Sequence, residues 1–381
     1  MNALKGPPPF YQHDNRRESV PGPGNFSLLC APGPAPSPNR EFAFFFLHPK
    51  NGSNKNVYIQ RKYQELLKYK ESDECLNDLL QRNLIKLIAI DIDGTLADDN
   101  SKISDENLNA IKLAKRLGIK VILATGRLHN FSMRMFTQKQ KDTYELEKMD
   151  GVYSHGAYLN IKGVDYVYRK FNMIDIEFIL FALSSRNALK NATFITPNVV
   201  YIFNDDPEFK KHYPVCEIGD DVLINVKKDK SLDKRHNAVL LTHVKDILMI
   251  GDIVSVEIYE KIHPEQEPLK ELHTELYSEL ENRFKIYVPP HKGKIVLSPI
   301  NTSKIQTIQL YAQFYDIPLN HILSIGNDNN DLEMLASTGY SVVVKGSTKP
   351  ALKVARCVST KTNNENAVAN IIFKVITGRH M

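Results

Sequence analysis

The feature that most constrains the fold is an apolar run that ends in two acids. Residues 85–90 are almost all aliphatic, and Asp91 and Asp93 follow directly. A short run of this kind is typical of a buried parallel strand, which in open α/β folds delivers polar residues to the ligand-binding edge of the sheet. Two close carboxylates repel each other. The pair therefore requires either a divalent cation or separate roles as nucleophile and general acid.

Strands and helices alternate on both sides of a long central segment. A helix predicted over 104–117 is followed by an apolar strand at 120–124, and the same rhythm returns from residue 303. A strand–helix–strand unit implies a parallel sheet with a right-handed crossover. Short strands, turns and helices fill residues 158–295, which is typical of an α+β insert.

We therefore expect an α/β protein with a doubly wound, Rossmann-like parallel-sheet core and an inserted α+β cap domain. The core should comprise residues 84–157 and 296–381, and the cap residues 158–295. Residues 1–83 would form an N-terminal extension, helical over 56–83. Residues 1–40 hold nine of the twenty prolines and are expected to be disordered.

Composition excludes several classes of protein. The 381 residues are 24% charged with a net charge of +5, which does not indicate a nucleic-acid partner. The four cysteines are widely spaced without a CxxC pair, so we expect neither a disulfide framework nor a zinc site. We expect the protein to reside in a reducing compartment. No run is long enough to cross a membrane. These features predict a cytoplasmic protein, with organelle targeting by the extension as the alternative.

Several strand ends carry polar groups that can converge on one site. Thr125 follows the strand at 120–124, an amide and acid cluster occupies 327–331, and Lys304 begins a predicted helix. Together with the two acids they suit phosphoryl transfer, which needs a positioned nucleophile and neutralisation of charge on the phosphoryl oxygens. Carboxylate, amide and carbonyl oxygens suit Mg²⁺.

Four motifs, in order, resemble those of the haloacid dehalogenase superfamily, specifically Cof-type phosphatases with a large cap inserted after the third core strand. The matching segments are 91–95 for DxDGT, 124–127 for ATGR, 303–304 for the Ser-Lys pair, and 326–331 for GDxxND with one substitution. The resemblance covers residues 84–381. Each motif falls at a predicted boundary between elements.

The resemblance implies a role for each site residue. Asp91 would attack phosphorus, Asp93 would act as general acid and then base, and Lys304 would hold Asp91 and bind phosphoryl oxygens. Contacts to the phosphate or the substrate would come from Thr125, Gly126, Arg127, His155 and Asn330. The Mg²⁺ shell would involve Asp91, Asp93, Asn327 and Asp331.

Two departures from the family pattern bear on the predicted site. Asn327 replaces the usual Asp at the metal position, which removes one negative charge and should weaken Mg²⁺ binding. His155 stands where an Asn is common, which affects a substrate contact.

The resemblance implies a Mg²⁺-dependent phosphatase that hydrolyses small phosphorylated metabolites, such as sugar phosphates or nucleotides, through an aspartyl-phosphate. One alternative is a phosphotransferase or mutase, in which phosphate passes to a second substrate. Another is a catalytically weak phosphate-binding regulatory protein, which Asn327 motivates. The expected partner is a small phosphorylated metabolite, with no nucleic acid and no membrane. The sequence determines neither the oligomeric state nor the substrate.

Overall fold

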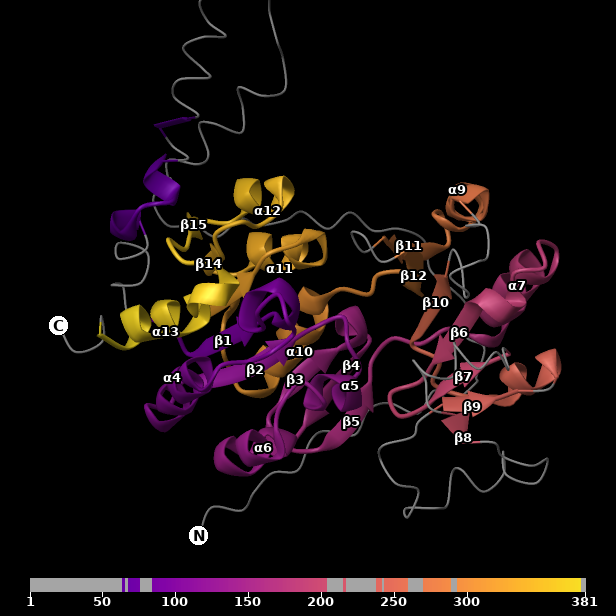
Figure 1. Cartoon of the computed structure of the whole chain (residues 1–381), viewed down its shortest axis with the longest axis horizontal. Coiled ribbons are helices and arrows are strands. Elements are labelled where there is room, and N and C mark those ends of the chain that lie inside the picture. The colour runs from indigo at the N-terminus through magenta and orange to yellow at the C-terminus, as the bar shows by residue number, and fades with distance from the viewer. Residues whose placement is uncertain are drawn as a thin grey trace, which may run out of the picture. The chain divides into compact units, whose positions relative to one another are not determined.

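A computed structural model describes residues 64–65, 68–75, 84–203, 215–216, 238–241, 243–259, 270–288 and 293–377 (Figure 1). Residues 1–67 and 68–381 form separate compact units, and each is considered by itself. The predictions for residues 1–40 lie outside the described residues, as does most of the predicted helix at 56–83. Within the described residues, no helix is long and apolar enough to cross a membrane.

The core is an eight-stranded sheet in the order β15-β14-β13-β1-β2-β3-β4-β5. Its strands are β1 (Leu87–Ile90), β2 (Lys120–Ala124), β3 (Gly151–Tyr153), β4 (Tyr158–Ile161), β5 (Val164–Val167), β13 (Ile322–Gly326), β14 (Tyr340–Val343) and β15 (Cys357–Val358). The strands from β15 to β3 run parallel, whereas β4 and β5 are antiparallel. The predicted parallel-sheet core is confirmed.

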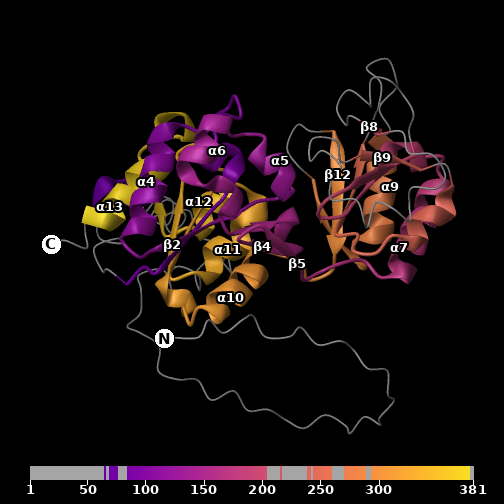
Figure 2. The ribbon, with the colours of Figure 1, turned by 90° about the horizontal axis from the view of Figure 1, so that it is seen from below.

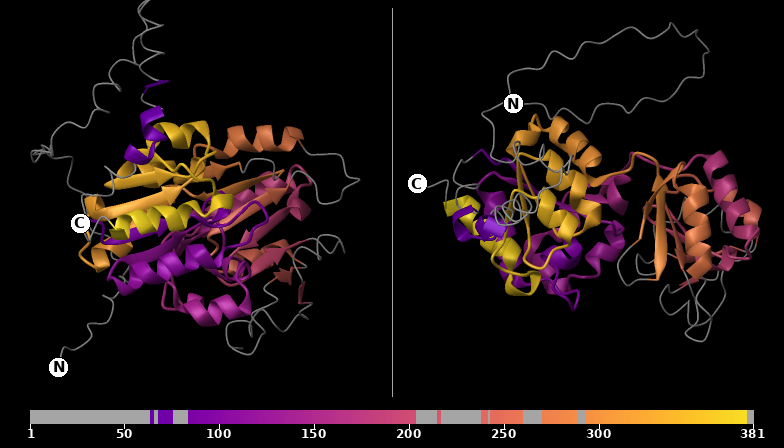
Figure 3. Two further views of the ribbon diagram at one scale, coloured as in Figure 1. Left: turned by 60° about the vertical axis from the view of Figure 1, so that its left-hand side comes forward. Right: turned by 90° about the horizontal axis from the view of Figure 1, so that it is seen from above.

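Helices pack on both faces of this sheet (Figure 3). They are α4 (Asp105–Arg116), α5 (His129–Met133), α6 (Gln138–Tyr144), α10 (Lys304–Phe314), α11 (Leu332–Ser337), α12 (Lys349–Val354) and α13 (Ala367–Thr377). In β1, Ile88 and Ile90 pack into the apolar cluster that contains α4 and α13, while Leu87 and Ala89 pack into the one that contains α10. Successive side chains of β1 therefore point alternately to the helices on the two faces of the sheet. Both sets are buried, which explains the continuous apolar run.

The predicted helix at 104–117 forms as expected. The Ser104 side chain accepts a hydrogen bond from the Asn107 N–H at 3.1 Å and caps the first turn of α4. Gly118 follows the helix with a φ of +81°, a conformation that other residues adopt at a cost.

The cap is a second, seven-stranded sheet in the order β11-β12-β10-β6-β7-β9-β8. Its strands are β6 (Ala192–Ile195), β7 (Val200–Ile202), β8 (Val215–Cys216), β9 (Ala238–Leu240), β10 (Ser255–Tyr259), β11 (Phe284–Tyr287) and β12 (Lys294–Pro299). Figure 2 shows α7 (Met173–Ser184) and α9 (Lys270–Leu280) against the face of this sheet that is turned away from the core. The mixed pairing of β6 to β12 confirms the predicted α+β insert.

In the structure, both boundaries between core and cap lie at other residues than the sequence predicted. The hairpin of β4 and β5, predicted to begin the cap at residue 158, pairs with β3 and extends the core sheet. At the other end, β12 stays in the cap sheet as far as Pro299, beyond the predicted boundary at 295. Strand pairing decides both limits, and a change in local composition does not reveal it.

One disulfide departs from the expectation drawn from cysteine spacing. Cys75 is bonded to Cys357, which is the first residue of β15, and their Cα atoms are 6.2 Å apart. The two residues are 282 positions apart in the chain. Only the folded core brings the segment 68–75 beside β15, so spacing carries no signal for this pair.

Candidate active site

The predicted site residues come together at the carboxyl edge of the core sheet. Asp91 follows β1, Thr125 follows β2, Ser154 follows β3, and the 327–331 loop follows β13. These four strands are parallel, so their ends meet on one edge. Lys304 enters from the first turn of α10.

A buried charge network lies at the centre of this edge. Lys304 Nζ donates to Asp91 Oδ1 and to Asp331 Oδ1, both at 2.6 Å. All three side chains are at most 4% exposed. A charge buried this deeply is tolerated only when it is paired, and here one ammonium serves two carboxylates.

The network shifts the pKa values of its members. Burial and the charge of Asp331 raise the pKa of Asp91 to about 7, with a further contribution from Asp93, although Lys304 acts in the opposite direction. Burial disfavours the charged form of Lys304, but Asp331 and Asp91 outweigh it and raise its pKa. The cluster is therefore short of positive charge, a condition that a bound cation would relieve.

Asp331 holds the loop that carries Asn327. Its second oxygen accepts the N–H groups of Asn327 at 2.9 Å and Asp328 at 3.2 Å. A Cβ on Gly326 would lie 2.6 Å from this carboxylate, so the close approach requires glycine. The protein itself therefore engages both oxygens of Asp331, one with Lys304 and the other with the loop that carries Asn327.

Asp93 lies at the mouth of the site and pairs with Arg127. The guanidinium makes a two-pronged contact, with Nε to Oδ2 at 2.8 Å and Nη2 to Oδ1 at 2.6 Å. The hydrogen bonds that Arg127 donates to Asp93 raise the pKa of Arg127. Thr125 is fully buried, and its hydroxyl accepts the N–H of Arg127 at 3.1 Å. Arg127, which we predicted to contact phosphate, thus contacts Asp93, a predicted catalytic residue, in this structure.

His155 packs against the turn that follows β2. A Cβ on Gly126 would lie 2.4 Å from the imidazole, so this position requires glycine. The backbone of His155 has a φ of +57°, and its ring lies 5.0 Å from the ring of Tyr287 in the cap. Burial, followed by the charge of Lys304, lowers the pKa of His155 to about 3. The imidazole is therefore neutral at physiological pH.

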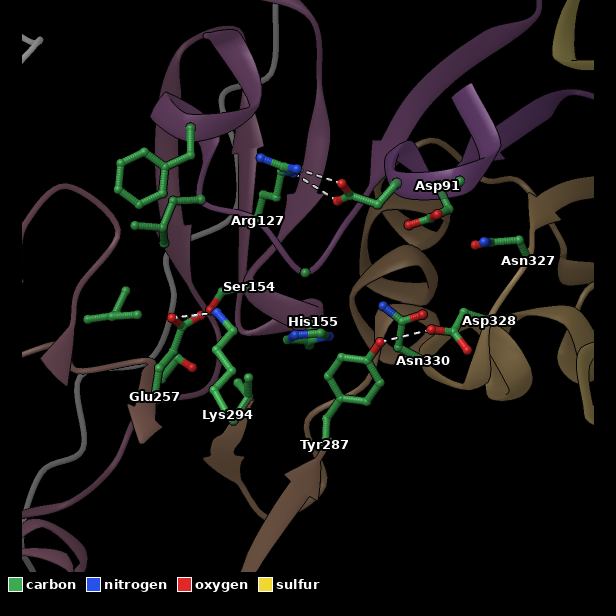
Figure 4. A pocket seen from close by; sticks show the side chains of 18 of the residues that line it. Asp91, Arg127, Ser154, His155, Glu257, Tyr287, Lys294, Asn327, Asp328 and Asn330 are labelled. Atoms are coloured by element: carbon green, nitrogen blue, oxygen red, sulfur yellow. Dashed lines mark hydrogen bonds and ion pairs between the residues drawn. The ribbon is translucent and has the colours of Figure 1, made fainter. Parts of the chain in front are cut away.

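A pocket of about 770 Å³ lies between this edge and the cap sheet. From the core it is lined by the predicted residues Asp91, Asp93, Gly126, Arg127, His155, Asn327 and Asn330. Thr125, Lys304 and Asp331 are not among its lining residues but lie directly behind them. Figure 4 shows Asp91 and Asn327 on one side of the pocket and Glu257 and Lys294 on the other.

The cap contributes lining residues that the sequence analysis missed. They are Ile195, Ser255, Glu257, Tyr287, Lys294 and Val296, and the core adds Asp328, Leu128 and Phe131. Lys294 Nζ lies 2.6 Å from Glu257 Oε2, and the Tyr287 hydroxyl donates to Asp328 Oδ2 at 2.9 Å. The one available signal was Glu257, a lone acid inside the otherwise mostly apolar strand 253–259.

The oxygen donors at the edge fit a hard cation. Among the described residues, no cluster of three or more His, Cys, Asp or Glu side chains has a metal-binding arrangement. A Cβ on Gly94 would lie 2.3 Å from the Asn327 amide, and Thr95 Oγ1 donates to Asn327 Oδ1 at 3.2 Å, so Asn327 lies against the loop that carries Asp91 and Asp93. Mg²⁺ prefers such oxygens.

Comparison with known proteins agrees with this geometry. The family model for haloacid dehalogenase-like hydrolases matches residues 88–372. The 5-amino-6-(5-phospho-D-ribitylamino)uracil phosphatase YitU of Bacillus subtilis is 25% identical over 295 residues, covering 75% of this chain and 96% of the relative. The phosphatase YwpJ of the same organism is 26% identical, covering 76% of this chain and 99% of the relative.

Solved structures agree on the fold. A HAD/COF-like hydrolase from Plasmodium vivax matches with a TM-score of 0.64 at 24% identity, covering 79% of this chain and 99% of that one. A haloacid dehalogenase-like hydrolase from B. subtilis matches with a TM-score of 0.59 at 23% identity, covering 76% and 99%. With the motifs in order at one sheet edge and the cap inserted in the core, the chain belongs to the haloacid dehalogenase-like hydrolases of the Cof type.

Proposed function

We propose that this enzyme is a Mg²⁺-dependent phosphatase that hydrolyses small phosphorylated metabolites through an aspartyl-phosphate on Asp91. The observation that carries the proposal is the buried contact of Lys304 with Asp91, at the inner end of a pocket closed by the cap. The contact orients one oxygen of Asp91 and leaves the carboxylate at the pocket wall. An oriented carboxylate of this kind acts as a nucleophile in phosphoryl transfer.

The roles of the neighbouring residues follow from their contacts. Lys304 neutralises charge next to Asp91 and stands ready to bind a phosphoryl oxygen. Asp93 would protonate the leaving group and later take a proton from the attacking water. In this structure both of its oxygens accept hydrogen bonds from Arg127. In the first step Asp93 has to separate from Arg127 to protonate the leaving group. The dianionic phosphate of the substrate can then take the place of Asp93 as the partner of Arg127.

A bound Mg²⁺ would neutralise charge on the phosphoryl group and orient it for in-line attack. The residues that would hold it are Asp91, the main-chain carbonyl of Asp93, and Asn327. Asp331 would keep the Asn327 loop in place through its two backbone hydrogen bonds.

The size and lining of the pocket support a small substrate. Ligand pockets commonly measure about 300 to 1,000 Å³, and the volume of about 770 Å³ lies within that range. Relatives that match nearly end to end are named phosphatases, and one carries the name of a phosphorylated ribitylaminouracil. Both observations favour metabolite phosphates over a macromolecular substrate.

The test is release of inorganic phosphate from p-nitrophenyl phosphate with and without Mg²⁺. We expect turnover that depends on Mg²⁺, and in Asp93→Asn a slowly hydrolysed phosphoryl group on the peptide that contains Asp91, detectable by mass spectrometry. Transfer of phosphate to an added sugar in place of release would favour the phosphotransferase alternative. Turnover that appears only after Asn327→Asp would favour the regulatory alternative.

A further inference from the structure

An ion pair on the cap faces the catalytic residues across the pocket. Glu257 of β10 and Lys294 of β12 meet at 2.6 Å, and each side chain is 17% exposed. The Tyr259 hydroxyl donates to the same Glu257 oxygen at 2.5 Å. Glu257 and Lys294 both line the pocket, opposite Asp91 (Figure 4). The pair therefore lies where the leaving group of a phosphate ester would reach when its phosphate lies beside Asp91.

The face of the cap sheet that carries this pair is not the one that forms the cap core. Side chains alternate along a strand, so neighbours in β10 and β12 point to opposite faces. The pocket-facing residues are Ser255, Glu257, Lys294 and Val296. The intervening residues Val256, Ile258, Ile295 and Leu297 belong to the apolar cluster of α7 and α9. The pair is thus separate from the packing that folds the cap.

Stability does not account for this pair. A mostly buried ion pair contributes little relative to packed apolar residues, because desolvation of both charges offsets their attraction. The neighbours Ile195 and Val296 show that apolar side chains fit on the same face. Two opposite charges side by side on a pocket wall instead suit a ligand that both donates and accepts hydrogen bonds.

We propose that Glu257 and Lys294 select substrates whose leaving group is neutral and polyhydroxylated, such as a sugar or a sugar alcohol. Each hydroxyl donates to a carboxylate and accepts from an ammonium, so adjacent hydroxyls can span the pair. An anionic leaving group would face Glu257, and a cationic one would face Lys294. An apolar leaving group would shield both charges from water and offer them no hydrogen bond. This inference rests on the proposed phosphatase function and names its substrate class.

The test compares two kinds of phosphate ester in the full-length chain with Mg²⁺. Ribitol 5-phosphate and ribose 5-phosphate carry polyhydroxylated leaving groups, whereas p-nitrophenyl phosphate carries an aromatic one without the adjacent hydroxyls. In Glu257→Gln and in Lys294→Met, we expect kcat/KM for the two pentose esters to fall about 10- to 100-fold, as for the loss of a charge-assisted hydrogen bond. We expect the value for p-nitrophenyl phosphate to change less than about threefold, because that leaving group makes no hydrogen bond to the pair.

A matched control is Glu275→Gln, which removes a cap ion pair to Arg186 that does not line the pocket. It should leave both classes of substrate unchanged. Should either single variant fail to fold, Glu257→Gln combined with Lys294→Met leaves no unpaired charge and serves in its place. Its selectivity should shift from the pentose esters toward p-nitrophenyl phosphate.

The outcomes separate this proposal from the function on which it rests. Equal losses on both substrate classes would overturn the selectivity of the pair. Turnover of p-nitrophenyl phosphate by the unmodified chain without turnover of either pentose ester would overturn the substrate class and leave the phosphatase standing. If neither class is hydrolysed with Mg²⁺, the phosphatase function fails and this inference fails with it.

Discussion

The two walls of the pocket are built on different principles. On the core wall, Asp91, Asp331 and Lys304 form a buried network that a parallel sheet assembles at its edge. On the cap wall, Glu257 and Lys294 come from neighbouring strands of a largely antiparallel sheet and pair across it. Asp91 and Asp331 lie in loops that follow strands and Lys304 lies in the first turn of α10, whereas the cap residues lie within strands.

On the two proposals above, the core wall carries out the reaction and the cap wall selects the substrate. The core network is buried and closely constrained, so small changes there should remove activity or stability. The cap wall is partly exposed, and its residues face away from the apolar cluster that folds the cap. Substitutions there should change which substrate is used while the reaction itself continues. The following predictions test this contrast.

The largest effect should follow Asp91→Asn. Asparagine keeps the size of the side chain and can accept the Lys304 hydrogen bond, but it is a far weaker nucleophile. We expect kcat on p-nitrophenyl phosphate to fall by about 10³-fold or more with the fold retained by circular dichroism. Asp142→Asn, on α6 and outside the pocket, is the matched control. Retention of most of the activity in Asp91→Asn would show that the nucleophile is not on the core wall.

Lys304→Met should mainly affect stability. It removes the ammonium shared by Asp91 and Asp331 and leaves their carboxylates without it in a buried site. We expect the free energy of unfolding to fall by about 3 to 5 kcal/mol, measured with urea in the absence of metal. Lys102→Met, at an exposed position, should change it by less than about 0.5 kcal/mol. If Lys304→Met lowered the free energy of unfolding as little as Lys102→Met does, the two carboxylates would not depend on the Lys304 ammonium for their burial.

The response to Mg²⁺ should depend on pH. Burial and Asp331 raise the pKa of Asp91 from 3.8 to about 7, so the folded protein binds this proton more tightly than the unfolded chain. The stabilisation from this group is present below pH 3.8 and is lost as the pH rises through about 7. Mg²⁺ needs the ionised carboxylate, so its stabilising effect should be small at pH 5 and reach about 2 to 3 kcal/mol at pH 8 when the cation is about 100 times its Kd.

Thermal unfolding at the two pH values, with excess Mg²⁺ or with EDTA, measures this difference. In Asp91→Asn the gain from Mg²⁺ should shrink and lose its dependence on pH. An equal shift in Tm at both pH values in the unmodified chain would contradict the assignment of Asp91 to the metal.

The smallest effect should follow Tyr287→Phe. The substitution removes the hydroxyl that donates to Asp328 and keeps the ring beside His155. We expect kcat/KM to fall about 3- to 10-fold, as for one hydrogen bond. Tyr277→Phe, on the exposed surface of α9, is the control and should have no effect. A loss of a hundredfold or more would place a residue of the cap in the chemistry and blur the distinction between the walls.

Much of the core was predictable because its signals are local. The apolar run before Asp91 marks a strand buried on both faces, and Ser104 and Gly118 mark the limits of α4. The parallel order of the strands then requires Asp91, Thr125 and Asn327 to share one edge. The domain limits were less accessible, since the β4–β5 hairpin could pair with either sheet on local evidence.

Several pairings between distant residues were not predictable. The sequence placed Asp93 and Arg127 in one site but did not indicate that they pair with each other, and it carried no signal for the bond between Cys75 and Cys357. The Glu257–Lys294 pair depends on the register between β10 and β12, which places Tyr259 opposite Lys294 and Glu257 opposite Val296. A shift of one residue would turn the side chains of a strand to the other face.

Linear order was thus enough to predict which side chains gather at one edge of the core sheet, because strand direction follows from a short apolar pattern and the crossover rule. The tertiary structure decided how charged residues such as Glu257 and Lys294 pair, and which face of the cap sheet lines the pocket. Those choices depend on strand register and on burial, and both arise from contacts between residues far apart in the chain.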